Sequence, residues 1–130
     1  MVEIYQFDRQ TDDDLIMILC TVDDVDMPIV LDTGASHTLI DFASLVDANY
    51  RLGDTIGLVP VVTANGVVLA NRFRIKRFEA LGVIRENFVV TSFILEDASL
   101  TMKGVLGLDF LQDYEFCINM PLQTIKLKPL

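Results

Sequence analysis

The chain has 130 residues and a formal net charge of −9 at pH 7, with 19 acidic and 10 basic residues. This length suits a single domain, residues 1–130, that is large enough to bury a hydrophobic core. The acidic balance argues against nucleic acid as a partner, because a surface that follows phosphate groups needs an excess of Lys and Arg.

Hydrophobic residues make up 52% of the chain, a share that suggests apolar surface buried against another subunit. The longest apolar run near the start, residues 15–20, is too short to span a membrane, and residues 1–10 lack the pattern of a signal peptide. We therefore expect a cytoplasmic protein without membrane contact. In such a protein Cys20 and Cys117 are expected to be buried thiols rather than a disulfide.

Two acid-rich segments, 12–14 and 23–26, raise the question of a cation site. Calcium loops, however, need ligands at regular alternate positions and a Gly for the bend. Neither the cysteines nor the single His, His37, has the spacing of a zinc site. Solvated turns are the favoured interpretation, and we expect no metal and no cofactor.

The first third of the chain predicts strands separated by acidic turns. Residues 2–7 mix apolar and polar side chains as a short strand does. Residues 15–22 form a nearly continuous apolar strand, consistent with burial on both faces. After the turn at 23–26, residues 28–31 predict the strand that leads into Asp32.

Asp32, Thr33 and Gly34 form a carboxylate-bearing turn with apolar residues on both sides. Gly34 permits backbone angles that other residues resist, and Leu39 and Ile40 return the chain to the core. An Asp in apolar surroundings is costly to ionise, so a lone one would be neutral or hydrogen-bonded, and either state could be structural. Chemistry at this position therefore needs a partner group.

A short helix is predicted after this turn. Asp41 can cap a helix over 42–48, and a loop over 49–57 follows it. The helix would place three apolar side chains on one face: Phe42, Leu45 and Val46.

The middle of the chain predicts a long β-hairpin. Residues 58–63 and 67–75 are apolar, β-branched runs joined through Ala64, Asn65 and Gly66. Asn-Gly between two such runs is the strongest short-range hairpin signal.

A row of basic side chains follows in the second strand of this hairpin. Arg72, Arg74 and Lys76 alternate with apolar residues, and together with Arg77 they hold four of the ten positive charges. The row could recognise an acidic peptide, or it could be a solvated strand face that also blunts a sheet edge. The sequence favours the second interpretation.

Further strands are predicted over 81–84 and 87–95, with a turn at Arg85-Glu86. A polar connection, expected to be mobile, covers 96–103. Residues 104–111 then place two glycines around a short apolar strand, which indicates a close backbone crossing in the core.

The end of the chain predicts a helical turn or two and a closing hairpin. The helical segment covers 108–114. The hairpin pairs 115–119 with 124–127 around the turn at 120–123.

The motifs and their order resemble the single-domain retropepsin type of aspartic protease. Asp32-Thr33-Gly34-Ala35-Ser36 matches the active-site loop of that family. The hairpin around Asn65-Gly66 stands where such enzymes have their flap, and Val105-Leu106-Gly107 matches the segment that packs beneath the catalytic turn. The resemblance covers almost the whole chain, and it implies an all-β closed barrel with a flap hairpin and one or two short helices.

The resemblance also implies roles for single residues. Asp32 would be the catalytic aspartate, Thr33 would bond across a dimer axis, and Gly34 would let the backbone approach the substrate. Because the chain holds one Asp-Thr-Gly, a complete pair of aspartates requires a homodimer that acts on a protein or peptide substrate. Substrate contacts would come from Ala35, Ser36, Ala64, Asn65, Gly66 and Leu106.

Two positions depart from the retroviral pattern. Retroviral members usually have an acidic residue where this chain has Ser36 and an Arg where it has Leu108, and the two pair near the dimer interface. Neither is present here. The resemblance is therefore closer to cellular and bacterial retropepsin-like proteins.

Three functions are consistent with these observations. The first is a dimeric aspartic endopeptidase, and the second is a retropepsin-like domain that binds peptides or supports assembly while cleaving little. The third is an acidic β-barrel binding protein whose two motif matches are accidental. Intact Asp32, Thr33 and Gly34 favour the first, because a scaffold has no need for a costly buried carboxylate.

Overall fold

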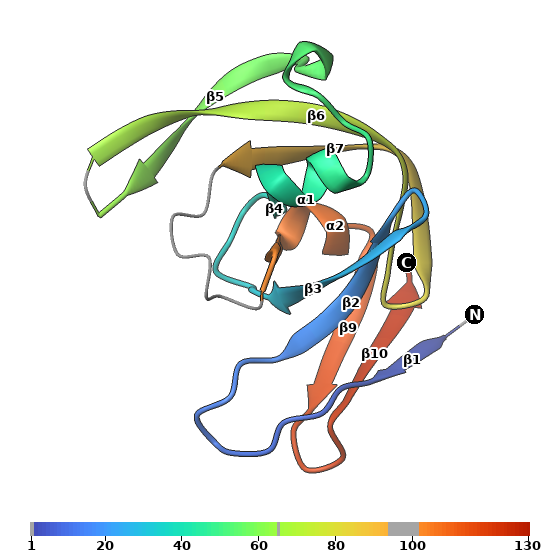
Figure 1. The fold of residues 1–130 in the computed structure, drawn as a ribbon. Helices are drawn as coiled ribbons and strands as arrows, with labels where there is room; N and C mark the ends of the chain where they lie inside the picture. The colour runs from blue at the N-terminus through green and yellow to red at the C-terminus, as the bar shows by residue number, and fades with distance from the viewer. Residues whose placement is uncertain (1, 65, 94–101) are drawn as a thin grey trace.

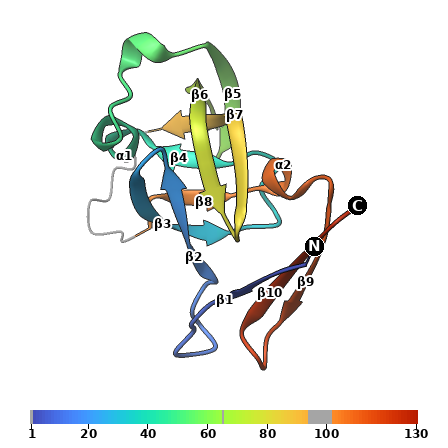
Figure 2. The ribbon, with the colours of Figure 1, turned by 90° about the vertical axis from the view of Figure 1, so that its right-hand side faces the viewer.

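The computed structural model describes residues 2–64, 66–93 and 102–130. Within these ranges the chain is mostly β, with two short α-helices and one 3₁₀ turn (Figures 1 and 2). The strands are β1 (Glu3–Gln6), β2 (Met17–Val22), β3 (Val25–Leu31), β4 (Leu39–Asp41), β5 (Gly57–Thr63), β6 (Gly66–Ala80), β7 (Val83–Phe93), β8 (Gly104–Leu106), β9 (Tyr114–Asn119) and β10 (Thr124–Pro129). The helices are α1 (Phe42–Asp47) and α2 (Leu108–Leu111), and the 3₁₀ turn is Leu52–Asp54.

Six strands close into a barrel in the order β2-β3-β8-β4-β7-β6, and β2 pairs with β6 to complete the ring. The closing register sets Cys20 opposite Ala80 and Val22 opposite Phe78. β3 and β8 are parallel neighbours, as are β4 and β7, so the barrel is mixed. The mixed pairing places β8 between β3 and β4, beneath the loop that joins them.

Two smaller units extend from this barrel. β5 pairs with the first half of β6 to form the flap hairpin, which projects from one side of the barrel in Figure 1. β1, β10 and β9 form a separate antiparallel sheet at another side. The predicted flap and the predicted C-terminal hairpin are both confirmed.

The core fills the barrel and the underside of the small sheet. Phe78, Phe88 and Phe110 pack together with ring centroids 5.1 to 5.7 Å apart, and such ring pairs stabilise a core beyond their buried area. The largest fully buried side chains are Phe73, Phe78, Phe110, Ile29, Ile40, Leu45, Ile75, Leu106, Ile125, Leu127, Val22 and Val90.

The turn predicted at Arg85-Glu86 is wrong. The chain turns instead at Leu81 and Gly82, whose φ angles are 54° and 78°, so both central residues have the positive φ of a tight two-residue hairpin. Leu rarely adopts this conformation, and the turn therefore carries no clear signal in the sequence. β6 and β7 are consequently long strands, and Arg85 lies within β7.

Burial of 15–22 on both faces is also wrong. Leu15 lies outside β2 and is 61% exposed, and Leu19 within the strand is 48% exposed. β2 shows the alternation of a strand with one buried face.

The predicted helices are present but shorter. α1 begins at Phe42 as expected, yet Asp41 makes no capping hydrogen bond to it, and Val46 is 48% exposed rather than part of the buried face. α2 ends at Leu111, because Asp113 takes a φ of 73° and Tyr114 starts β9. No helix in the described ranges is long and apolar enough to cross a membrane.

The two cysteines are free thiols, as predicted, but only one is buried. Cys20 lies in the barrel, where burial raises the pKa of its thiol to about 12. Cys117 is exposed on β9, contrary to the prediction.

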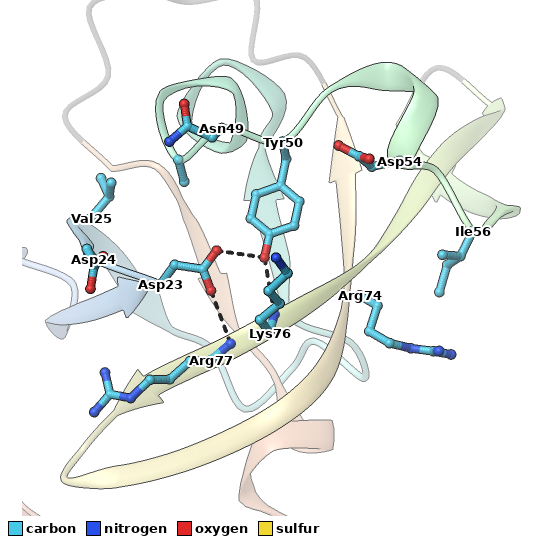
Figure 3. Close-up of a pocket in the computed structure, with 11 residues that line it drawn as sticks. Asp23, Asp24, Val25, Asn49, Tyr50, Asp54, Ile56, Arg74, Lys76 and Arg77 are labelled. Carbon is cyan, nitrogen blue, oxygen red and sulfur yellow. Dashed lines mark hydrogen bonds between the residues drawn. The ribbon is translucent and has the colours of Figure 1, made fainter.

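Tyr50 and Asp23 connect β6 to two neighbouring segments, as the dashed lines in Figure 3 show. The Tyr50 hydroxyl donates to Asp23 Oδ2 at 2.8 Å and accepts the backbone N–H of Lys76 at 3.1 Å. Asp23 Oδ1 accepts the backbone N–H of Arg77 at 3.1 Å. Burial is the largest cause that raises the pKa of Tyr50 to about 12, and the Asp23 carboxylate adds to it.

Tyr50→Phe is expected to lower the free energy of unfolding by about 1–2 kcal/mol near pH 7, because Asp23 and the Lys76 N–H both lose a partner. The pKa of Tyr50 is raised in the folded state, so the unfolded state loses its proton first as the pH rises above about 10. The stability that Tyr50 adds therefore falls between about pH 10 and 12. Urea unfolding of both proteins at pH 7, 9, 10 and 11 measures this; a gap that widens above pH 10 would contradict it.

Candidate active site

The loop from Asp32 to Thr38 joins β3 to β4 and is held from below by β8 and the start of α2. The backbone N–H of Asp32 donates to the carbonyl of Leu106 at 3.0 Å, and the N–H of Leu108 donates to the carbonyl of Ala35 at 2.8 Å. The loop is thus fixed at its start and in its middle by one short segment, residues 106–108. This is the close backbone crossing that the two glycines predicted.

Gly107 makes this crossing possible. A Cβ atom there would lie 2.6 Å from the carbonyl carbon of His37 and 2.9 Å from the carbonyl oxygen of Ala35. Real Cβ atoms essentially never approach backbone so closely, and a larger residue would push the loop upward.

Thr38 and Asp109 add a polar connection to the crossing. The hydroxyl of Thr38 donates to Asp109 Oδ1 at 2.7 Å and accepts the N–H of Gly107 at 3.1 Å. The N–H of Thr38 lies 3.0 Å from both carboxylate oxygens of Asp109. Thr38 is completely buried, so this contact ties the end of the loop to α2 where water does not compete.

α2 is held in turn by Arg85 from β7. The Arg85 guanidinium donates to the carbonyls of Phe110 and Gln112 at 2.7 and 2.9 Å. It also lies over the rings of Phe110 and Tyr114, 5.2 and 5.6 Å from their centroids. The support beneath the loop therefore extends through α2 into the barrel wall.

Asp32 is half-buried at the top of this supported loop. Its Oδ1 accepts the N–H of Gly34 at 2.9 Å, and a Cβ on Gly34 would lie 3.1 Å from that oxygen. The carboxylate is therefore oriented by its own loop, while part of it remains open to solvent.

The neighbouring predicted residues lie on the open side of the loop. Thr33, Gly34 and Ser36 are exposed, and Ala35 is partly exposed. The Ser36 hydroxyl lies 3.0 Å from Nδ1 of His37, which is also exposed.

Leu106 was predicted to contact substrate, and its side chain is completely buried. Its carbonyl oxygen supports Asp32 instead. In this chain Leu106 therefore holds the loop from below.

The flap tip stands apart from the loop in Figure 1. Ala64 and Gly66 are exposed at the tip, while the predicted Asn65 lies outside the described residues. The predicted connection over 96–103 also lies largely outside them. The structure thus brings together the loop residues of the predicted site and leaves the flap residues at a distance.

Among the pockets lined by described residues, two have volumes of about 780 Å³, and Asp32 lines neither of them. One lies at the base of the flap, beside Tyr50 and β6. The other lies on the outer face of the small sheet, beside Cys117. Among the described residues, no group of three or more His, Cys, Asp or Glu side chains is placed to hold a metal ion.

Sequence reasoning missed Thr38 and Asp109. One signal was available, since Asp109 is the single charged residue in the apolar stretch 104–111, and buried charges need partners. The identity of that partner, 71 positions earlier in the chain, had no signal.

The comparisons with known proteins agree with this geometry. The family model described as "gag-polyprotein putative aspartyl protease" matches residues 18–113, a range that contains both the Asp32 loop and Gly107. Among solved structures, a retropepsin-like aspartic protease from Rickettsia conorii superposes with a TM-score of 0.76 at 20% identity, over 98% of this chain and 91% of that one. A search of curated proteins finds no match.

The structural likeness confirms the predicted retropepsin-like barrel, since a TM-score of 0.76 over almost the whole of both chains shows a shared fold. The family model covers well over half of the sequence. The chain therefore belongs to the retropepsin-like aspartyl protease family.

Proposed function

We propose that the chain is an aspartic endopeptidase that works as a homodimer, with Asp32 of each subunit forming the catalytic pair. The observation that carries the proposal is the partly open carboxylate of Asp32 on a loop that is fixed from below by residues 106–109. A rigid carboxylate at a solvent-facing position can act on a bound molecule, because no further free energy is needed to orient it during the reaction.

The chemistry requires two carboxyl groups in different protonation states. Two aspartates a few ångströms apart share one proton, because both cannot ionise at that distance. The ionised one takes a proton from water, whose oxygen attacks the peptide carbonyl carbon, while the protonated one donates to the carbonyl oxygen. The first carboxyl group then gives the proton that it took from water to the nitrogen, and the second takes a proton back from a hydroxyl of the tetrahedral diol. The C–N bond breaks to give an acid and an amine, and the pair again holds one shared proton.

The exposed position of the loop supports the two-subunit arrangement. The chain has a single Asp-Thr-Gly, so the second carboxylate must come from another copy. Thr33 next to Asp32 is exposed, and its side chain has no hydrogen bond to any described residue. It is available to bond across a two-fold axis, where each subunit presents the same surface to the other.

The flap supports peptide as the substrate. Residues 57–71 contain no charged side chain, and Val62, Val67 and Leu69 are 82, 65 and 67% exposed. An exposed apolar hairpin of this kind is typical of a binding surface. We assign substrate contacts to Ala35 and Ser36 in the loop and to Ala64, Asn65 and Gly66 at the flap tip.

Cleavage of a diverse peptide mixture, read by mass spectrometry between about pH 4 and 7, tests this function over a range of protein concentrations. A catalytic dimer that dissociates on dilution gives cleavage that rises more steeply than the total protein concentration. Cleavage that stays proportional to concentration while sedimentation reports a monomer would contradict the shared pair. An absence of cuts from a confirmed dimer would instead favour a peptide-binding module.

A further inference from the structure

Three cations lie in a row on one side of β6. Arg72, Arg74 and Lys76 occupy alternate positions of the strand, so their side chains leave the same face, about 7 Å apart. The residues between them, Phe73 and Ile75, are completely buried in the barrel. The row therefore faces outward from the barrel wall.

No described carboxylate forms an ion pair with this row. The one ion pair among the described residues joins Arg77 to Glu79 at 3.2 Å, and the strand partners of Arg72 and Arg74 on β7 are Thr91 and Val89. The Nε of Arg72 is buried and has no hydrogen-bond partner among the described residues. A buried guanidinium nitrogen without a partner is unusual, and it indicates an acceptor that this part of the chain does not supply.

The pocket at the flap base adjoins the row. Arg74 and Lys76 line it together with Tyr50 and Ile56, and Figure 3 shows Lys76 beside the Tyr50 ring with Arg74 further along β6.

The acidic residues of this pocket, Asp23, Asp24 and Asp54, form no ion pair with the row. Both Asp23 oxygens accept internal hydrogen bonds. Asp54 Oδ2 accepts the N–H of Arg51 at 2.8 Å. Asp24 lies at the opposite end of the pocket from Arg74 in Figure 3.

The sheet-edge explanation favoured by the sequence accounts for only part of the row's surroundings. β6 pairs with β7 along one edge and with β5 and then β2 along the other. Between β5 and β2, the backbone N–H groups of Lys76 and Arg77 are already bonded to Tyr50 and Asp23. Residues 73–77 therefore have no strand partner on this edge, and side chains from neighbouring segments occupy part of it.

We propose that Arg72, Arg74 and Lys76 form a docking site for an acidic peptide segment in extended conformation. Alternate side chains of such a segment have the same spacing of about 7 Å as the row, so successive carboxylates can meet successive cations. The chain carries 19 acidic residues against 10 basic ones, so an acidic segment is repelled by most of the surface and directed to this row. If the proposed protease function holds, the segment belongs to the protein substrate and lies outside the bond that is cut.

Binding is measured first with catalytically disabled protein, so that the result does not depend on cleavage. Fluorescence anisotropy measures the affinity of the Asp32→Asn protein for a fluorescent peptide of alternating Glu and Val. The control is the same peptide with Gln in place of every Glu. The Glu peptide is expected to bind roughly three- to tenfold more tightly at low salt. The difference should vanish near 1 M salt, where screening acts over about 3 Å.

The double variant Arg74→Gln/Lys76→Gln is expected to lose this difference. Its matched control is Lys126→Gln/Lys128→Gln, which removes two exposed cations at alternate positions of β10 and should keep the difference. Equal binding of the Glu and Gln peptides by the Asp32→Asn protein would overturn the proposal. Loss of the difference in the β10 control to the same extent as in the β6 variant would overturn it as well.

The link to catalysis is then tested with a cleavable peptide that carries either the Glu peptide or the Gln peptide as a tail. Gly-Ser spacers of graded length join the tail to the cleavable part. A higher kcat/KM for the Glu-tailed substrate, lost in Arg74→Gln/Lys76→Gln, is expected. An equal kcat/KM for the Glu-tailed and Gln-tailed substrates at every spacer length would show that the row does not bind the substrate of the protease. Absence of cleavage by the wild type contradicts the protease function alone, because the anisotropy result stands independently of it.

Discussion

Asp32→Asn is expected to lower peptide cleavage by at least about 10³-fold, because an amide can neither take the proton from water nor share one with a second carboxyl group. The loop should keep its shape, since the Asn carbonyl oxygen can still accept the N–H that Gly34 donates to Asp32 Oδ1. The free energy of unfolding and the sedimentation coefficient should therefore stay close to those of the wild type. Single-turnover cleavage at high enzyme concentration measures the loss without interference from weak association.

Asp24→Asn is the matched control for this experiment. It makes the same chemical change at an exposed turn, and the cleavage rate should stay within about twofold of the wild type, since surface substitutions away from a site have small effects. Cleavage that persists in Asp32→Asn would remove Asp32 from the mechanism. An equal loss of cleavage in Asp24→Asn would show that the change in net charge, rather than the loss of the Asp32 carboxylate, lowers the rate.

Gly107→Ala is expected to destabilise the fold more than Tyr50→Phe does. The new methyl group would lie 2.6 to 2.9 Å from backbone atoms of His37 and Ala35, and backbone that is held by hydrogen bonds cannot move aside at low cost. We expect a loss of about 2–4 kcal/mol in the free energy of unfolding, measured by urea denaturation. Cleavage should fall as well under conditions where the variant remains folded, because the Asp32 loop is displaced from below.

Gly53→Ala is the control for Gly107→Ala. A Cβ at Gly53 would meet no atom within 4 Å, and Gly53 does not need a positive φ, so the added methyl group should change stability by less than about 1 kcal/mol. If Gly107→Ala unfolds at the same urea concentration as this control, the crossing beneath the loop is looser than the geometry indicates.

Local sequence signals predicted the parts of the fold that depend on neighbouring residues. The Asp32 loop, the flap with Gly66 at its tip and the close crossing at Gly107 all follow from glycines and turn residues within short apolar stretches. In each case the residue type needed for the backbone geometry is present at the position that needs it.

The errors occurred where strand pairing or distant contacts decide the structure. Leu81 takes a positive φ because β6 and β7 pair on both sides of it, with Ala80 opposite Val83, and tertiary pairing here overrides the local preference of Leu. The bond between Thr38 and Asp109 likewise requires the barrel to bring α2 beneath the loop. Such pairings have no local periodicity, so a single sequence does not reveal them.

The closure of the barrel also has a kinetic consequence. The pairing of β2 with β6 completes the ring and sets Cys20 opposite Ala80. The pairing of β3 with β8 supports the Asp32 loop and sets Val30 opposite Val105. These partners are far apart along the chain, so much of the loop-closure entropy is lost before the contacts form. Chains dominated by such pairings fold in milliseconds to seconds rather than in microseconds, and we expect the Asp32 loop to become ordered only in the last phase of refolding.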